Sequence, residues 1–307
     1  MDKRLYDMVI IGGGPGGYTA ALYAARAGLS VAVVEKLSAG GQMALTDKIE
    51  NYPGFPEGID GYELAEKMQQ QAESFGAETI YGEVTALELN GDIKHIHSDS
   101  GSFQSRTVVI AAGANPRKLG LPEEEALTGR GIHYCAHCDG MFYRDKTVVV
   151  VGGGNSAAAD AMILSRMAKK VILVHRRDSL RATKVYHEAL RNAPNVKFIW
   201  NSQISELLGD GDFRGIRIRD LLSGEEREVE CDGVFVSIGR IPAGGLVEGQ
   251  LEQDGSGYIV AGESTQTSLP GVFAVGDVRT KALRQVVTAV ADGAVAAHYA
   301  EEYLLKA

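Results

Sequence analysis

The sequence is poor in cysteine, in basic charge and in long apolar runs, and each shortage excludes a class of protein. Three cysteines in 307 residues are too few for a disulfide-stapled scaffold. Lys and Arg number 31 against 40 Asp and Glu, and this net charge of −9 argues against nucleic acid as a general partner. No run approaches the ~18 consecutive apolar residues that a membrane helix needs. We therefore expect neither a nucleic-acid partner nor a membrane span.

The first apolar run, Met8–Ile11, ends in three glycines and is too short for an export signal. We therefore expect a cytoplasmic protein, in which a Cys-x-x-Cys pair is more often redox-active or metal-binding than structural. The length allows about two domains. Hydrophobic residues make up 45% and glycine is abundant at 38 residues, which is typical of α/β proteins because tight strand-to-helix turns consume glycine.

A dinucleotide-binding pattern opens the chain. Strand, glycine turn, helix, strand and acid follow one another over Met8–Ile11, Gly12–Gly17, Tyr18–Ala27, Val31–Val34 and Glu35. The turn is a G-x-G-x-x-G motif of Gly12, Gly14 and Gly17, in which backbone can approach a pyrophosphate at the helix N-terminus. Glu35 is placed to accept hydrogen bonds from ribose hydroxyls.

The same pattern returns at a constant offset of 140 residues, so that Gly152 aligns with Gly12 and Gly154 with Gly14. The second copy predicts strands over Thr147–Val151 and Val171–Val174 and a helix over Ser156–Met167. In place of Glu35 it has His175, Arg176 and Arg177, with Arg181 beyond. Arginines bind a ribose 2′-phosphate, which an acid would repel. We therefore assign the second site to NADPH and the first to a cofactor without that phosphate, such as FAD.

Between the copies lies a pair of cysteines, Cys135 and Cys138, followed at once by Asp139. Such a pair can close and reopen a disulfide, and its thiolate is the reactive form. A zinc cluster of His133, Cys135, His137 and Cys138 is the alternative. Four ligands crowded into six residues do not match the usual spacing of structural zinc, and no second cysteine pair exists. We expect no metal, and we expect the third cysteine, Cys231, to pack as a small hydrophobe.

Two clusters of glycine and proline, at 113–116 and 239–245, predict domain boundaries. Tyr62–Gly76 reads as an amphipathic helix with Leu64, Met68, Ala72 and Phe75 in the core. The polar loops at 40–42 and 50–54 fit either a surface excursion or a segment that lies against an extended cofactor. Asp277 ends a strand and can bind a polyol hydroxyl, and the helix that begins near Arg284–Val286 could stabilise a reduced flavin.

Together these motifs resemble the low-molecular-weight thioredoxin reductases of bacteria. The similarity covers nearly the whole chain, through GGGPGGYTAALYAARAG, IENYPGFPEGIDG, CAHCDGMFYRDK, GGGNSAAAD, HRRDSLRAT and VFAVGDVRTKALRQVVTAVADGAVAA. It implies an α/β fold of two Rossmann-like, three-layer ββα domains. The FAD domain would be built from 1–115 and 245–307, and the NADPH domain, 116–244, would be inserted in it and carry the dithiol. The family is homodimeric.

The resemblance implies a relay in which NADPH reduces FAD, FAD reduces the Cys135–Cys138 disulfide, and the dithiol reduces thioredoxin, with domain rotation between the half-reactions. Cys138 would face the flavin, Cys135 would attack thioredoxin, and Asp139 would protonate the departing thiolate. Residues implied for FAD are Gly12, Gly14, Pro15, Gly17, Glu35, Gly40, Gly41, Gln42, Asn51, Val84, Gly113, Gly276, Asp277, Arg284, Gln285 and Val286. Those for NADPH are Gly154, Asn155, Ser156, His175, Arg176, Arg177 and Arg181.

Two departures from the family pattern stand out. His137 lies between the cysteines where a small residue or threonine is expected, and Ala159 replaces a carboxylate that many members carry. A different electron donor or acceptor, such as ferredoxin, a peroxiredoxin-type partner or oxygen, is the rival interpretation within the same enzyme class.

Overall fold

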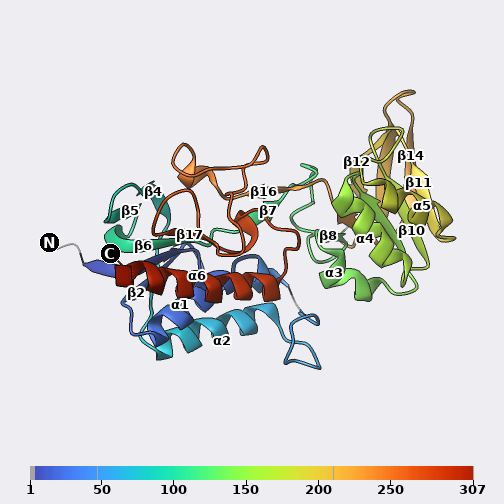
Figure 1. The fold of residues 1–307 in the computed structure, drawn as a ribbon. Coiled ribbons are helices and arrows are strands. Elements are labelled where there is room, and N and C mark those ends of the chain that lie inside the picture. The colour runs from blue at the N-terminus through green and yellow to red at the C-terminus, as the bar shows by residue number, and fades with distance from the viewer. Residues whose placement is uncertain (1–3, 47, 210, 307) are drawn as a thin grey trace. The chain divides into compact units, whose positions relative to one another are not determined.

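The computed structural model describes residues 4–46, 48–209 and 211–306. These residues form two compact units, one lying within 1–115 and 241–307 and the other within 116–240 (Figure 1). The first unit is therefore discontinuous in sequence, and the second is inserted in it.

The first unit is built on a seven-stranded sheet among the described residues, in the order β3-β2-β1-β6-β5-β4, with β17 beside β6. Strands β1, β2, β3, β6 and β17 run parallel, whereas β4 and β5 add an antiparallel edge. The strand bounds are β1 Leu5–Ile11, β2 Val31–Glu35, β3 Glu78–Tyr81, β4 Val84–Glu88, β5 Lys94–Ser98, β6 Gly101–Ile110 and β17 Val272–Ala274.

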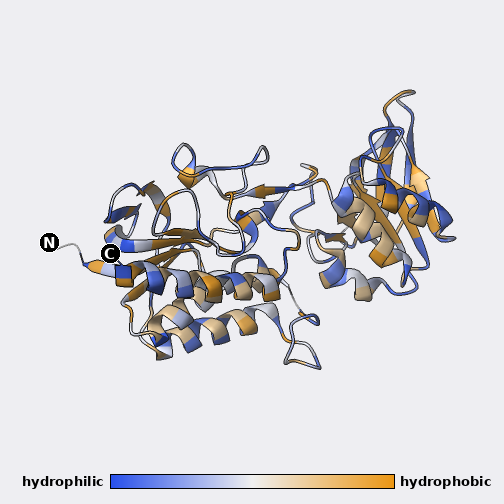
Figure 2. Cartoon of the chain, in the orientation of Figure 1, coloured by the Kyte–Doolittle hydropathy of each residue, from blue (hydrophilic) through white to orange (hydrophobic). Residues whose placement is uncertain are grey.

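The central strand β1 is apolar on both faces, because both faces of the sheet are covered. Met8 and Ile10 join the core formed with the helices, while Val9 and Ile11 join the core on the opposite face. The strands accordingly form the hydrophobic centre in Figure 2. The helices on the first face are α1 Pro15–Arg26, α2 Gly61–Ser74 and α6 Val286–Lys306, and short 3-10 turns lie at η1 Gly41–Leu45, η3 Gly245–Val247 and η4 Gly276–Val278.

The inserted unit has a five-stranded parallel sheet among its described residues, in the order β11-β10-β9-β15-β8. One face packs against helices, and the other packs against the antiparallel sheet β12-β13-β14. The bounds are β8 Ile132–His133, α3 Ala136–Asp139, η2 Gly140–Tyr143, β9 Thr147–Val151, α4 Asn155–Ser165, β10 Lys170–Val174, α5 Lys184–Asn192, β11 Val196–Ile199, β12 Ser202–Leu208, β13 Gly215–Asp220, β14 Glu226–Glu230 and β15 Gly233–Val236. Both units are layered α/β structures, so the predicted fold class is confirmed.

The predicted repeat at an offset of 140 is seen in the backbone. Gly12 donates from its N–H to the carbonyl of Val34 at 2.9 Å, and Gly152 donates to the carbonyl of Val174 at 3.1 Å. The helix that follows is capped by Gly14 in one unit and by Gly154 in the other, each with extended backbone. The two units thus share one strand-turn-helix geometry.

Two short strands, β7 Ala114–Pro116 and β16 Arg240–Pro242, lie where the chain passes between the units, and they pair with each other. Within the first unit the N–H of Ala243 donates to the carbonyl of Gly113 at 3.0 Å. Within the inserted unit the N–H of Arg117 donates to the carbonyl of Gly239 at 2.9 Å. In each unit, the residue at which the chain leaves therefore lies beside the residue at which it enters.

One core prediction was wrong. Leu64 and Ala72 are buried in α2 as expected, but Phe75 is 50% exposed. The helix ends at Ser74, so Phe75 occupies the C-cap, where its ring lies under the guanidinium of Arg26 at 5.4 Å. In the described parts of the chain, no helix combines the length and the apolar character needed to cross a membrane.

Candidate active site

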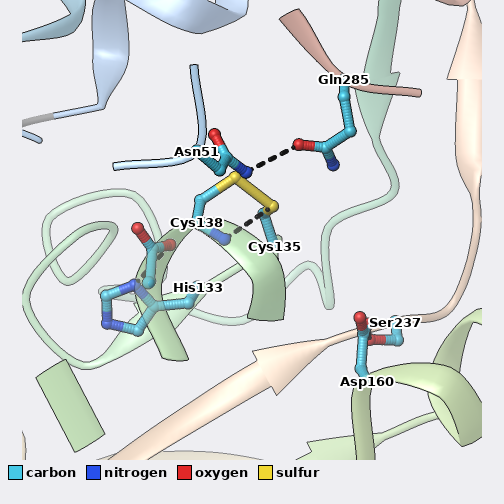
Figure 3. Close-up of a disulfide and its surroundings, with 8 residues drawn as sticks. Asn51, His133, Cys135, Cys138, Asp160, Ser237 and Gln285 are labelled. Carbon is cyan, nitrogen blue, oxygen red and sulfur yellow. Dashed lines mark hydrogen bonds and ion pairs between the residues drawn. A yellow bond between two sulfur atoms is a disulfide. The ribbon is translucent and has the colours of Figure 1, made fainter. Parts of the chain in front are cut away.

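Cys135 and Cys138 form a disulfide at the start of α3 (Figure 3). Cys135 is the N-cap residue, and its sulfur accepts a hydrogen bond from the backbone N–H of Cys138 at 3.2 Å. Both cysteines are half-buried, and His137 between them is exposed. Because a backbone N–H at a helix start stabilises a thiolate, Cys135 is the better candidate for the attacking nucleophile once the disulfide is reduced.

Asp139 ends α3 and is held by a buried histidine that the sequence reasoning considered only as a zinc ligand. The Oδ2 atom of Asp139 lies 2.9 Å from Nδ1 of His133, and Nε2 of His133 lies 2.6 Å from the hydroxyl of Tyr143. His133 and Tyr143 are both buried. A histidine two residues before a redox cysteine was the available signal, but its partners follow from the fold.

The environment of the third cysteine and the grouping of possible metal ligands can both be read from the structure. Cys231 is buried, and burial raises the pKa of its thiol to about 12, so it is inert at neutral pH as expected. Across the residues that the structure describes, no three His, Cys, Asp or Glu side chains gather as a metal site would require.

The first glycine turn leaves room where a ligand would approach. A Cβ added to Gly17 would lie 2.0 Å from the carbonyl oxygen of Gly12, and one added to Gly12 would lie 2.6 Å from that of Ala111. Gly14 differs, because its added Cβ would meet only the carbonyl oxygen of Gly40, at 4.0 Å. Two of these glycines are thus needed for packing, whereas Gly14 borders open space in front of the helix.

Glu35 stabilises this turn. Its Oε2 atom accepts from the N–H of Gly13 at 2.7 Å, and Oε1 accepts from the N–H of Leu37 at 3.1 Å. A carboxylate has about four acceptor positions, so capacity for ribose hydroxyls remains.

Other residues predicted for FAD come together from distant parts of the first unit. The amide of Asn51 donates to Gln285 at 3.0 Å, and that of Gln42 donates to Asn115 at 3.1 Å (Figure 3 shows the first pair). Both polar loops that the sequence left undecided are therefore tied to the rest of this unit. Val84 is buried in the core, so only its backbone can face a ligand.

A buried ion cluster supports the turn at Gly276 and Asp277, and sequence reasoning missed it. Asp292 of α6 accepts from the N–H of Gly276 at 2.8 Å, from Arg279 at 2.6 Å and 2.9 Å, and from Lys281 at 2.7 Å. Burial alone would raise the pKa of Asp292, but hydrogen bonds from the two cations outweigh it and hold that pKa below its usual range. An acid within an apolar helix was the sequence signal.

Arg284 lies beside the turn at Gly276 and Asp277 and binds its backbone. Its guanidinium donates to the carbonyl oxygens of Asp277, Lys281 and Arg279 at 3.3, 3.4 and 3.2 Å, and it lies over the ring of Tyr258 at 4.1 Å. These contacts fix the segment that leads into α6.

The second glycine turn is also open. A Cβ added to Gly154 would meet nothing within 4 Å, and the side chain of Asn155 accepts from the N–H of Thr183 at 2.8 Å. His175 follows β10 and is buried against Gly153, and its Nε2 has no hydrogen-bond partner among the described residues.

The charge around His175 is strongly positive. Burial lowers the pKa of His175, and the nearby charges of Arg181, Arg176 and Arg177 lower it further. All three arginines are exposed, so this end of β10 presents a cationic surface that suits a phosphate.

A carboxylate that the sequence reasoning did not select lies on α4. Asp160 follows Ala159 directly, and the hydroxyl of Ser237 donates to it (Figure 3). Burial raises the pKa of Asp160, while the charges of His137 and Arg240 oppose that rise.

Comparisons with known proteins agree with this geometry. Residues 6–293 match the family of pyridine nucleotide-disulphide oxidoreductases. The chain is 44% identical to the thioredoxin reductase of Treponema pallidum, over 97% of each chain, and 44% identical to that of Bacillus subtilis, over 98% and 96%. The solved thioredoxin reductase of Streptococcus pyogenes superimposes with a TM-score of 0.92 at 45% identity, over the whole of both chains.

The chain belongs to the thioredoxin reductase family. The resemblance found in the sequence is thereby confirmed. A Lactococcus lactis thioredoxin reductase in its FR conformation, 41% identical over 98% of this chain and 100% of its own, gives a TM-score of 0.71.

Thioredoxin reductases of this family use FAD and NADPH, and the chain is an oxidoreductase of that kind. The residues present fit both cofactors. Gly14 and Gly154 each border open space at a helix N-terminus, where backbone N–H groups favour a pyrophosphate. The three exposed arginines that follow β10 match the extra phosphate of NADPH.

Proposed function

We propose that this protein is an NADPH-dependent thioredoxin-disulfide reductase. The observation that carries the proposal is a disulfide next to a carboxylic acid, Asp139, in a chain with two open dinucleotide turns. In this proposal the unit of 1–115 and 241–307 binds FAD and the inserted unit binds NADPH. The paired linkers β7 and β16 act as the hinge on which the inserted unit turns between half-reactions.

The residues that would hold FAD are those of the first glycine turn with Glu35, the loops of Gln42 and Asn51, and the segment from Gly276 to Val286. Those that would hold NADPH are Gly154, Asn155 and Ser156, with His175 and the three arginines. When bound, the two cofactors supply the two electrons that open the disulfide.

Opening the disulfide breaks one S–S bond and leaves two thiolates. Asp139 gives its proton to the sulfur of Cys135, which is the leaving group if Cys138 is the sulfur that faces the flavin. Asp139 then takes that proton back as Cys135 attacks the disulfide of thioredoxin and forms a mixed disulfide. Cys138 attacks the sulfur of Cys135, which re-forms the internal disulfide and releases thioredoxin, whose two thiolates take their protons from solvent.

We further propose that the enzyme is a cytoplasmic homodimer. The support is the acidic composition and the resemblance to a homodimeric family. Sedimentation of the purified protein tests the dimer: a mass of about twice 32.8 kDa supports it, and a mass near 32.8 kDa contradicts it.

Steady-state turnover of the purified protein with NADPH, thioredoxin and a chromogenic disulfide tests the activity. We expect a yellow protein whose thioredoxin reduction is abolished by Cys135→Ser or Cys138→Ser and retained in the control Cys231→Ser. NADH and reduced ferredoxin serve as alternative donors and should support little turnover. A colourless protein that holds no flavin, or one indifferent to the loss of both redox cysteines, contradicts the proposal.

A further inference from the structure

Three hydrogen-bonded polar side chains run from Asp139 into the core of the inserted unit. His133 of β8 is 4% exposed and contacts Asp139 through Nδ1 and Tyr143 through Nε2. Its ring stacks on Phe235 of β15 with centroids 5.3 Å apart, and Tyr143 meets both rings edge-on at 5.0 and 5.4 Å. An imidazole that is bonded at both nitrogens and packed between two rings has a single orientation.

One tautomer of the imidazole satisfies both of these hydrogen bonds. Burial raises the pKa of Tyr143 to about 12, with smaller contributions from the charges of Asp139, Asp232 and Cys231, so its hydroxyl stays protonated and can donate to Nε2. With Tyr143 donating to Nε2, a neutral imidazole carries its proton on Nδ1 and donates it to Oδ2 of Asp139. A neutral ring protonated at Nδ1 satisfies all three groups.

We propose that His133 is the positioning residue of Asp139: it occupies Oδ2 and thereby reserves Oδ1 for the proton exchanged with the sulfur of Cys135. The inference rests on the proposed function, in which Asp139 is the acid and base of the dithiol. The arrangement serves both steps. Oδ2 accepts from Nδ1–H whether Oδ1 carries a proton, before the disulfide opens, or has given it to Cys135. His133 neither gains nor loses a proton in this cycle.

Other titratable groups around this chain enter the design of a test. Asp232 and Cys231 act electrostatically on Tyr143, and the ammonium of Lys146 lies 5.3 Å from the centre of the Tyr143 ring. His137 lies on α3 between the cysteines. A variant of His133 must therefore be compared with and without Asp139, because only an effect that passes through Asp139 disappears when Asp139 is replaced.

The test follows alkylation of Cys135 by iodoacetamide across pH in the Cys138→Ser holoprotein, where Cys231 is buried and does not compete. We expect a curve with two limbs, a lower one that depends on Asp139 and an upper one that belongs to the Cys135 thiol. His133→Phe keeps a ring on Phe235 but removes the donor, so the lower limb should move up by about one pH unit, the effect of losing one hydrogen bond to a charged group.

Matched variants make the result specific. Asp139→Asn should abolish the lower limb, and adding His133→Phe to it should change nothing more. His133→Asn keeps an amide donor near the place of Nδ1 and should restore most of the wild-type curve. Tyr134→Phe is the control for a lost hydroxyl beside the cysteines, because Tyr134 donates to Glu124 at 2.8 Å and not to Asp139; its curve should match the parent.

An equal shift by His133→Phe with and without Asp139, or no shift in a folded variant, overturns the inference. Imidazole ¹⁵N NMR spectra test the proposal on the wild-type protein itself. Nδ1 of His133 should be protonated and Nε2 unprotonated, and any other state contradicts the proposal. These readouts need no thioredoxin turnover. If turnover fails while they succeed, the proposed function is at fault and the positioning role stands.

Discussion

A pair of glycine-to-alanine substitutions tests whether the first glycine turn is built for a ligand or only for packing. Gly14 and Gly17 belong to the same motif, but the structure gives them opposite surroundings. A Cβ on Gly17 would lie 2.0 Å from the carbonyl oxygen of Gly12, whereas one on Gly14 would meet only the carbonyl oxygen of Gly40 at 4.0 Å. The backbone of Gly14, with φ −76° and ψ −178°, is open to alanine.

We therefore expect Gly17→Ala to be destabilised by about 3 kcal/mol or more, because backbone must move to relieve the overlap. Gly14→Ala should fold at least as stably as wild type, since alanine reduces the entropy of the unfolded chain by about 0.4–1 kcal/mol. The same Gly14→Ala substitution should weaken flavin binding by about 2 kcal/mol, roughly 30-fold, because the new methyl group occupies the approach of the pyrophosphate.

The assays are thermal unfolding of the flavin-free proteins and flavin content by absorbance after purification. Gly154→Ala is the matched control, because its Cβ also meets nothing within 4 Å but lies in the inserted unit. It should keep its flavin and raise the KM for NADPH. A Gly14→Ala protein with wild-type flavin affinity would refute the reasoning, and so would one that unfolds like Gly17→Ala.

Three further predictions concern charge. Arg176→Ala and Arg177→Ala should each cost about 2 kcal/mol of NADPH binding, roughly 30-fold in KM, and leave the KM for NADH unchanged; equal losses for both coenzymes would contradict the phosphate assignment. The pKa of Asp292 is held low by its cations, so its stabilisation is complete above the unfolded value of about 3.9 and is lost as pH falls toward the lower folded value. Asp292→Asn should therefore lower the melting temperature at neutral pH and flatten its decline in acid, and an unchanged acid limb would count against this. His137→Thr should make the dithiol more reducing, because threonine cannot supply the positive charge with which an imidazole stabilises a thiolate, and equal redox potentials would refute it.

The sequence predicted local geometry well, because glycine turns, strand ends and the offset of 140 residues depend on short segments. The strand β1 begins at Leu5, three residues before the predicted start, and the helix α4 ends at Ser165, two residues before the predicted end at Met167. Such differences arise because caps and edge pairing, which set the ends of elements, depend on neighbours outside the segment.

What the sequence did not reveal depends on contacts between distant segments. His133 stacks on Phe235 because strands β8 and β15 pair in parallel, and motifs read along the chain do not predict that pairing. The role of Asp292 could not be predicted, because its partners Arg279 and Lys281 lie in a loop before the helix, more than one helical turn away in the sequence. Phe75 was assigned to the core because its spacing fits the apolar stripe of a helix that ends one residue earlier.

The side-by-side ends of each unit have a consequence for how such a chain can be assembled. Gly113 and Ala243 are already hydrogen-bonded neighbours, so a short turn could join them and yield the flavin-type unit as one uninterrupted polypeptide. Arg117 and Gly239 likewise mark a natural start and finish for the excised partner. A gene that encodes one unit could therefore have received the other by a single insertion between these neighbouring residues. Such an insertion leaves the two backbone hydrogen bonds, one in each unit, intact.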